Sequence, residues 1–153
     1  MADDLDKFVE ELQQQIMEEV KRSYTNTVID HWIRPRNWGI LNNADGYGKV
    51  TGSCGDTMEI YLKVRDNKIV DCSFNTDGCG ITIACGSMVT ELIKGKELNQ
   101  LKSISQHTII DKFGGLPEPD QHCALLAANT LHAAIRDYER LKKEAWRKFY
   151  RKC

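Results

Sequence analysis

The sequence predicts an α+β domain in which helices cover one face of a small antiparallel sheet. Three observations support this fold class. Apolar residues recur at helical spacing near the N-terminus and again after residue 80, and a period of two occupies the region between. The order of helix, strands and then helices is typical of α+β domains. A chain of 153 residues with 41% hydrophobic content is long enough to bury one core.

Residues 3–22 are predicted to form the first helix. Ser23 can cap a second helical segment, which extends from Tyr24 to about Ile33 and is ended by Pro35. A loop rich in asparagine and glycine then leads to Gly48. The apolar side of the first helix follows a spacing of three or four on an otherwise polar surface, through Leu5, Phe8, Val9, Leu12, Ile16 and Val20.

Three strands are predicted after this loop. The segment 47–53 forms one strand, and a second follows from the strict alternation of apolar and polar residues over 58–65. Asp66 and Asn67 tolerate a left-handed backbone, so they predict a tight turn. The return strand is expected to place Val70, Cys72 and Phe74 on its core face.

From Gly80 the apolar pattern becomes helical up to Gly95. Short helical pieces are expected near 96–101 and 108–113, and a rigid loop over 114–119 follows. Asp120 is a suitable N-cap for a long final helix, which extends through Trp146 towards Tyr150. The apolar side of that helix comprises Ala124, Ala127, Leu131, Ala134, Ile135, Tyr138 and Leu141.

We expect residues 1–153 to be a single domain with an acidic helical extension at 1–22 and a basic tail at 142–153. Residues 1–20 hold seven acids against one base, and residues 136–153 hold eight bases against three acids. Two solvated helix faces are the simpler interpretation, and attraction between the two ends or to partners is the alternative. The net charge of −1 favours neither nucleic acid nor a membrane surface as a partner.

The compartment is expected to be the cytoplasm. No apolar run approaches the ~20 residues of a transmembrane helix, and the N-terminus has no apolar signal core. Thiols stay reduced in the cytoplasm, so six cysteines there indicate metal or redox chemistry before disulfides.

The cysteines divide by context. Cys72 lies on the core face of a strand and Cys85 on the apolar stripe of a helix, so both are interpreted as small buried hydrophobic residues. Cys85 is one or two helical turns from Cys79 and is also a candidate reserve thiol. Cys153 is the last residue, and its role is left open.

Cys54, Cys79 and Cys123 lie instead in glycine-rich turns or at a helix start. Neighbouring glycines let the backbone fold closely around an inorganic ligand and leave N–H groups free to donate to sulfide. Cys123 is expected in the first turn of the last helix, where the helix dipole favours a thiolate. Three thiols from separate elements predict a metal or iron–sulfur site.

Asp56 and His122 are the candidates for a fourth ligand. A closed structural zinc site usually has four Cys or His ligands. A carboxylate is a hard ligand and matches iron in a cluster poorly. We therefore expect a cluster that is held less tightly than by four thiolates, which suits assembly and release. A turn-forming Asp56 and a solvent-exposed His122 are the structural alternatives.

These residues resemble the iron–sulfur cluster assembly scaffold family, of the IscU and NifU N-terminal domain type. The resemblance covers about Tyr24 to Lys142. The order and spacing of the motifs carry it: Tyr24, Val28-Ile29-Asp30-His31, Pro35-Arg36-Asn37, Cys54-Gly55-Asp56, Asp77-Gly78-Cys79-Gly80, Ile83-Ala84, Val89-Thr90-Glu91, Lys94-Gly95-Lys96, Leu116-Pro117 and His122-Cys123.

The resemblance implies a scaffold, rather than an enzyme in the strict sense, on which a [2Fe–2S] cluster is built and then passed to apo-proteins. By position, Cys54, Cys79 and Cys123 would be the ligand cysteines and His122 a conditional ligand. Asp56 would be the residue whose replacement stabilises the bound cluster. Cys123 would accept persulfide sulfur from a cysteine desulfurase, and zinc would bind the same residues when no cluster is present.

The resemblance further implies a three-stranded antiparallel sheet with helices packed on it, and it leaves a homodimer open. Bacterial members carry a Leu-Pro-Pro-Val-Lys segment that a dedicated Hsp70-type chaperone reads. Residues 116–120 here read Leu-Pro-Glu-Pro-Asp, with an acid in place of the lysine, which puts that partnership in doubt.

Two other functions remain open. A zinc-dependent sulfur acceptor of the SufU type would use the same thiols. That branch has an insertion before the last cysteine and lacks the preceding histidine, whereas this chain has a compact 114–120 loop and His122. An interaction domain with a structural metal would unfold on chelation. The long apolar stripes predict a core that stands without metal.

Overall fold

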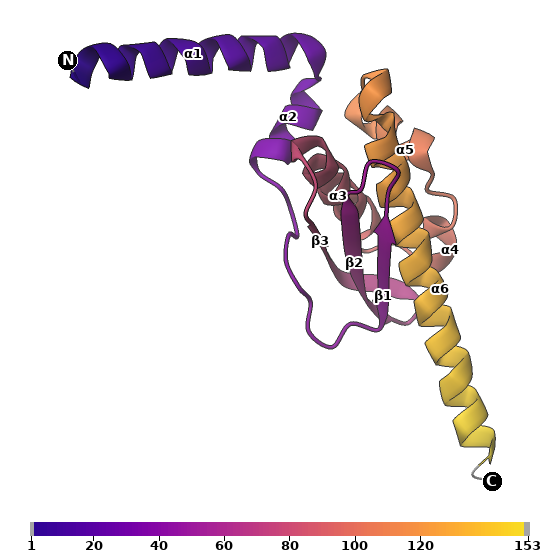
Figure 1. Cartoon of the computed structure of the whole chain (residues 1–153). Coiled ribbons are helices and arrows are strands. Elements are labelled where there is room, and N and C mark those ends of the chain that lie inside the picture. Colours follow the sequence, from indigo (N-terminus) through magenta and orange to yellow (C-terminus); the bar gives the residue numbers. More distant parts are fainter. Residues whose placement is uncertain (1, 152–153) are drawn as a thin grey trace.

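The computed structural model describes residues 2–151 and the surroundings of the side chains of residues 3–146. The β-strands form one antiparallel sheet in the order β1-β2-β3, and the helices cover one of its faces (Figure 1). This confirms the predicted α+β class. The elements are α1 (Ala2–Ser23), α2 (Asn26–Ile33), β1 (Gly46–Thr51), β2 (Thr57–Arg65), β3 (Lys68–Thr76), α3 (Gly80–Ile93), α4 (Leu98–Leu101), α5 (Gln106–Phe113), the 3₁₀ helix η1 (Glu118–Asp120) and α6 (Gln121–Arg151).

The predicted turn between β2 and β3 is confirmed, because Asp66 and Asn67 have φ of 53° and 63°. The face predicted for β3 is wrong at one position. Lys63 pairs with Asp71 and Val64 pairs with Ile69, so Val70 is an extra residue in the ladder. This bulge reverses the alternation, and Ile69 is buried whereas Val70 is 45% exposed.

The core lies between the inner face of the sheet and helices α3, α5 and α6. The alternating residues of β2 point into it, and so do Cys72 and Phe74 of β3. α6 approaches β1 at two buried glycines, Gly46 and Gly48. A Cβ on Gly48 would lie 2.5 Å from the backbone N of Ala134. The opposite face of the sheet is polar, with Tyr47 and Tyr61 in ring contact at 5.0 Å.

The start of α2 differs from the prediction. Thr25, not Ser23, is the N-cap, and its hydroxyl accepts from the N–H of Val28. The same hydroxyl donates to the carbonyl of Phe113 at 2.6 Å. Thr25 therefore caps α2 and joins its start to the end of α5, a tertiary role that Ser23 does not have in this structure.

α6 begins at Gln121, directly after Asp120. Asp120 belongs to the 3₁₀ helix that precedes α6. Its carboxylate accepts a hydrogen bond from the Tyr24 hydroxyl at 2.6 Å. Asp120 thus connects the loop before α6 to the start of the domain.

A buried histidine holds α2 against α3. Nδ1 of His31 lies 2.8 Å from the hydroxyl of Ser87, and Nε2 lies 3.0 Å from the carboxylate of Glu91. The Ser87 oxygen also accepts from the N–H of Arg36 at 2.8 Å. This pattern suits a neutral ring whose Nε2–H donates to Glu91 and whose Nδ1 accepts from Ser87.

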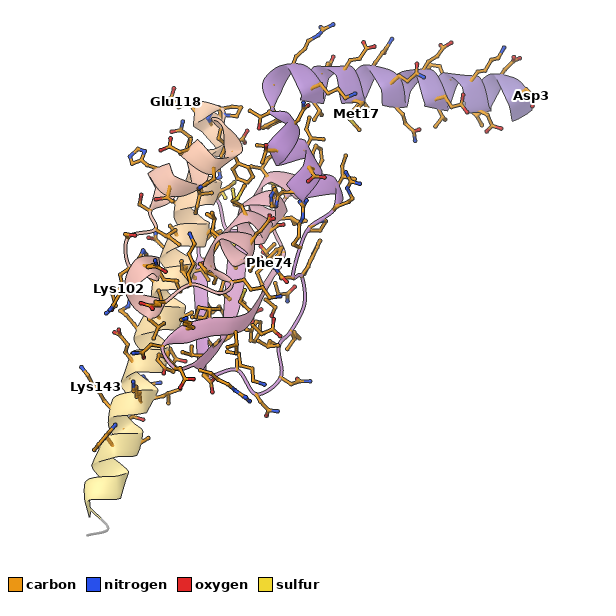
Figure 2. The ribbon with its side chains drawn as sticks, turned by 180° about the vertical axis from the view of Figure 1, so that it is seen from behind. Asp3, Met17, Phe74, Lys102, Glu118 and Lys143 are labelled. Carbon is orange, nitrogen blue, oxygen red and sulfur yellow. The ribbon has the colours of Figure 1, made fainter. Side chains whose placement is uncertain are left out.

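Both ends of the chain extend away from this body. α1 leaves it at α2 and projects sideways as a straight helix, and the last turns of α6 continue past the sheet at the other end of the body (Figure 1). Seen from behind, Asp3 and Lys143 lie at opposite extremes of the molecule (Figure 2). Among residues 2–151, no helix is long and apolar enough to cross a bilayer.

A side chain at Gly48 should destabilise the fold. In Gly48→Ala the new methyl would also lie 2.6 Å from the carbonyl oxygen of Thr130, so α6 must move off β1. We expect a loss of about 1–3 kcal/mol in the free energy of unfolding, measured with urea. Gly52→Ala is the matched control, because its Cβ would lie no nearer than ordinary contact distance, at 3.5 Å from the Leu126 side chain and 3.7 Å from the Asp56 carbonyl oxygen. Equal stability of the two variants would contradict this account.

His31 should make stability fall in mild acid. Burial, followed by the charge of Arg36, lowers the pKa of His31 below its ordinary 6.5. Below that pH the unfolded chain takes up a proton that the folded ring resists, so stability is present above pH 6.5 and is lost as the pH falls. We expect wild type to lose more stability than His31→Gln between pH 7.5 and 5.5 in urea titrations. Parallel losses in both proteins would assign the effect to other groups.

Candidate functional site

The predicted site residues come from three elements that meet at one end of the sheet. Cys54 and Asp56 lie in the turn between β1 and β2, and Cys79 is the N-cap residue of α3. Cys123 lies in the first turn of α6, next to His122. Cys54 and Cys79 are exposed, whereas Cys123 is only 1% exposed.

One buried hydroxyl links three of these residues. The Oγ1 of Thr82, which is fully buried, lies 3.1 Å from the Asp56 carboxylate and 3.4 Å from the Cys123 sulfur. It also lies 3.6 Å from the Cys79 sulfur. A hydroxyl has one proton, so it can donate to only one of these acceptors at a time. Thr82 therefore keeps the three groups close together without committing its proton to any one of them.

The two neighbouring thiols have different acidities. Burial opposes ionisation of Cys79, but hydrogen bonds from the backbone and hydroxyl of Thr82 and from the backbone of Ile81 outweigh it and lower its pKa. Burial raises the pKa of Cys123 to about 11, although the Thr82 hydrogen bond acts in the other direction. The expectation that the helix dipole favours a thiolate at Cys123 is therefore wrong for this conformation, because desolvation dominates.

Cys54 and His122 stand at the edge of this group. The turn that holds Cys54 is closed by a hydrogen bond from the Gly52 N–H to the Asp56 carbonyl at 2.8 Å. Gly55 has φ of +89°, which favours glycine. The charge of Cys54 contributes to the raised pKa of Cys123. His122 is closer to that thiol, with Nε2 at 3.6 Å from its sulfur.

The candidate ligands do not surround a common metal position. Within the described part of the chain, no three Cys, His, Asp or Glu side chains are arranged so that they could hold a metal ion as they stand. The structure brings Asp56, Cys79, Cys123 and His122 near one another and leaves Cys54 on its exposed turn.

The remaining cysteines behave as predicted where the structure describes them. Cys72 and Cys85 are buried in the core, and burial raises the pKa of each thiol, to about 12 for Cys72. The Cys72 thiol donates to the carbonyl of Thr90 at 3.3 Å. Cys153 lies outside the described residues.

Sequence reasoning missed two residues that shape the site. Thr82 follows the N-cap Cys79 by three positions, and this capping-box spacing could have indicated it. Trp32 of α2 covers the backbone beside Cys79, because a Cβ on Gly80 would lie 2.1 Å from its Nε1. Nothing in the sequence pattern singles out Trp32, since its contact with Gly80 arises only from the packing of α2 on α3.

Comparisons with known proteins agree with the fold. A family model described as NifU-like N terminal domain matches residues 23–145. The chain is 46% identical over 118 residues to iron-sulfur cluster assembly scaffold protein IscU 1 of Archaeoglobus fulgidus, which covers 76% of this chain and 77% of that protein. It is 42% identical over 128 residues to the iron-sulfur cluster assembly scaffold protein IscU of Escherichia coli. This match covers 80% of this chain and 98% of that protein.

Solved structures show the same architecture. A NifU-like N-terminal protein from Brucella abortus has a TM-score of 0.64 at 20% identity, over 79% of this chain and 97% of that one. At this identity the likeness concerns the fold alone. A SufU protein from Fervidobacterium islandicum AW-1 has a TM-score of 0.62 at 25% identity, over 74% and 97%.

Replacing Thr82 should change the reactivity of Cys79. Thr82→Val removes the hydroxyl but keeps the shape, so it raises the pKa of Cys79 and slows its reaction with iodoacetamide near neutral pH. Thr82→Ser retains the hydroxyl and serves as the matched control. Mass spectrometry of the apo-protein gives the rate at each cysteine. An unchanged Cys79 rate in Thr82→Val would show that the hydroxyl does not support the thiolate.

Proposed function

The chain belongs to the NifU-like N-terminal domain family, and from this premise we propose that it is a scaffold on which iron–sulfur clusters are assembled and then passed to apo-proteins. One observation of the structure carries the proposal most directly. Soft thiol ligands and a carboxylate from three separate elements meet at the buried hydroxyl of Thr82. A set that mixes soft thiolates with a hard carboxylate suits a cluster that must leave again.

We propose that Cys54, Cys79 and Cys123 bind the iron of the cluster. Thiolates are the ligands that iron–sulfur clusters prefer. The exposed Cys54 turn and the exposed Cys79 provide access for iron, and Cys123 closes the site from the side of the core. The lowered pKa of Cys79 makes this thiol more ready than Cys123 to bind as a thiolate. Asp56 or His122 would complete the ligand set.

Sulfur would arrive as a persulfide from a cysteine desulfurase, with Cys123 as the acceptor. The Cys123 thiolate attacks the outer sulfur of the persulfide, a new S–S bond forms, and the desulfurase thiolate leaves. This exchange needs no electrons, but two electrons from an external reductant must then split the new S–S bond into sulfide and thiolate. Since Cys123 is only 1% exposed, its sulfur must become accessible before the attack.

Release would use the weakest ligand. A carboxylate binds cluster iron less tightly than a thiolate does, so an incoming thiol of an apo-protein displaces Asp56 first. The hydrogen bond from Thr82 keeps this carboxylate beside the thiols and competes for its lone pairs. The scaffold then carries out ligand exchange and needs no catalytic group of its own.

We propose a [2Fe–2S] cluster as the cargo, zinc as an occupant of the same thiols in its absence, and the cytoplasm as the compartment. Residues 1–22 would be an extension of the single domain and residues 142–153 its tail. The SufU-type alternative would use zinc to present a thiol to the desulfurase. The compact 114–120 loop and His122 favour the scaffold over it.

Anaerobic reconstitution tests the proposal. The protein is incubated with iron, cysteine, a cysteine desulfurase and a reductant, and then analysed by absorption spectroscopy and by iron, sulfide and zinc content. We expect brown protein with near-equal iron and sulfide, and colour transfer to an apo-ferredoxin. Cys54→Ser, Cys79→Ser and Cys123→Ser should each lose the cluster, whereas Cys72→Ser should retain it if it folds. One tightly held zinc without any cluster after reconstitution would favour the sulfur acceptor instead.

Asp56 should govern how long the cluster stays. Removing the weak oxygen ligand in Asp56→Ala is expected to slow cluster loss several-fold on a desalting column or in the presence of a chelator. Asp111→Ala, an exposed acid on α5, is the control for a general change of charge. Equal or faster loss from Asp56→Ala than from wild type would argue against the role of this carboxylate.

A further inference from the structure

The N-terminal helix α1 exposes a continuous apolar stripe. Every side chain from Asp3 to Glu19 is exposed, and Phe8 and Ile16 remain 62% and 53% accessible. The stripe consists of Leu5, Phe8, Val9, Leu12, Ile16 and Met17. An isolated helix is only marginally stable in water, and amphipathic helices are stabilised mainly by burying their apolar side. α1 therefore presents a surface that another helix could cover.

The polar side of α1 is acidic, and its acids have no partners within the described residues. Asp4, Glu11 and Glu18 follow one another at intervals of seven along one edge of the stripe. None of the acids of α1 belongs to an ion pair among the side chains that the structure describes. A partner surface for α1 should hence be both apolar and basic.

The outer end of α6 has both properties. The core-facing side of α6 continues past the sheet through Leu141 and Ala145, and Leu141 is 42% exposed. Lys142 and Lys143 are exposed there and, within the described side chains, form no ion pair. The sequence continues with Arg147, Lys148 and Arg151. Two exposed helical segments of opposite charge thus belong to the same chain.

The two segments do not meet within one molecule. Asp3 and Lys143 lie at opposite extremes, with the whole sheet and α2 between them (Figure 2). α1 has 22 residues, a length of about 33 Å, and α6 is helical throughout to Arg151. We propose that α1 of one copy packs on the outer end of α6 of a second copy of this chain, with apolar stripes in contact and acids opposite bases.

Charge favours the α1–α6 contact over the two symmetric contacts that a pair of copies could form, α1 on α1 and α6 on α6. If α1 packed on α1, rows of aspartate and glutamate would face each other, which is unfavourable. Two α6 ends would likewise bring lysines together. Only the α1–α6 contact joins an acidic edge to a basic one. The attraction between exposed charges is screened by salt, so the contact should weaken as ionic strength rises.

Sedimentation of the full-length apo-protein at low and high salt tests the contact. We expect concentration-dependent association that Leu12→Asp weakens at least tenfold, whereas Gln14→Asp on the polar side of α1 leaves it within a factor of two to three. The double variant Lys142→Glu/Lys143→Glu should also weaken it, and Lys49→Glu/Lys63→Glu on the outer sheet face is the matched control for charge. A monomer at all concentrations would overturn the proposal.

A charge exchange separates the pairing from its alternatives. Glu11→Lys/Glu18→Lys should restore association when it is mixed with Lys142→Glu/Lys143→Glu. Zero-length cross-linking of a mixture of ¹⁴N- and ¹⁵N-labelled protein should join α1 acids to α6 lysines in mixed-isotope pairs. Loss of association in Leu12→Asp together with full association of Lys142→Glu/Lys143→Glu would show that α1 packs elsewhere. Cross-links found only within one isotope would likewise overturn the proposal.

Discussion

The close approach of α6 to β1 is the contact on which the rest of this structure depends. Gly46 and Gly48 have no side chains, so the backbone of α6 can lie directly on the strand. This contact fixes the direction of a helix of 31 residues. One end of α6 then brings Cys123 to the Thr82 hydroxyl of α3, and the other end passes beyond the sheet. The position of the site and the projecting basic end are two results of one packing contact.

Much of the fold could be predicted because periodicity and turn chemistry agree over long segments. Element types and order follow from the alternation in β2, the Asp66-Asn67 turn and the helical stripes. The failures arose where tertiary contacts decide between similar residues. Ser23 and Thr25 are equally good caps locally, and the bond of Thr25 to Phe113 distinguishes them. The bulge at Val70 has no sequence signal, because both Ile69 and Val70 suit a buried strand position.

The site could be predicted as a set of residues but not as a set of chemical states. Glycine-rich context and helix starts indicated Cys54, Cys79 and Cys123, and the structure places all three at one end of the sheet, whereas Cys72 and Cys85 lie in the core. A helix start alone does not determine acidity, since it leaves out burial. The thiol of Cys79 is exposed and supported by hydrogen bonds, whereas Cys123 is covered by the core, so two helix-start cysteines have pKa values shifted in opposite directions.

The indole of Trp32 lies against Gly80, next to one of the proposed ligands. Iron–sulfur clusters absorb light across the near-ultraviolet range, where tryptophan emits, and energy transfer to such a chromophore falls steeply with distance. A cluster bound at the proposed site should consequently quench the fluorescence of the neighbouring Trp32. Trp38 stacks on Phe74 of the sheet, and Trp146 lies on the outer end of α6. On the proposed function, Trp32 would thus serve as an intrinsic optical reporter of occupancy, one that needs no added dye.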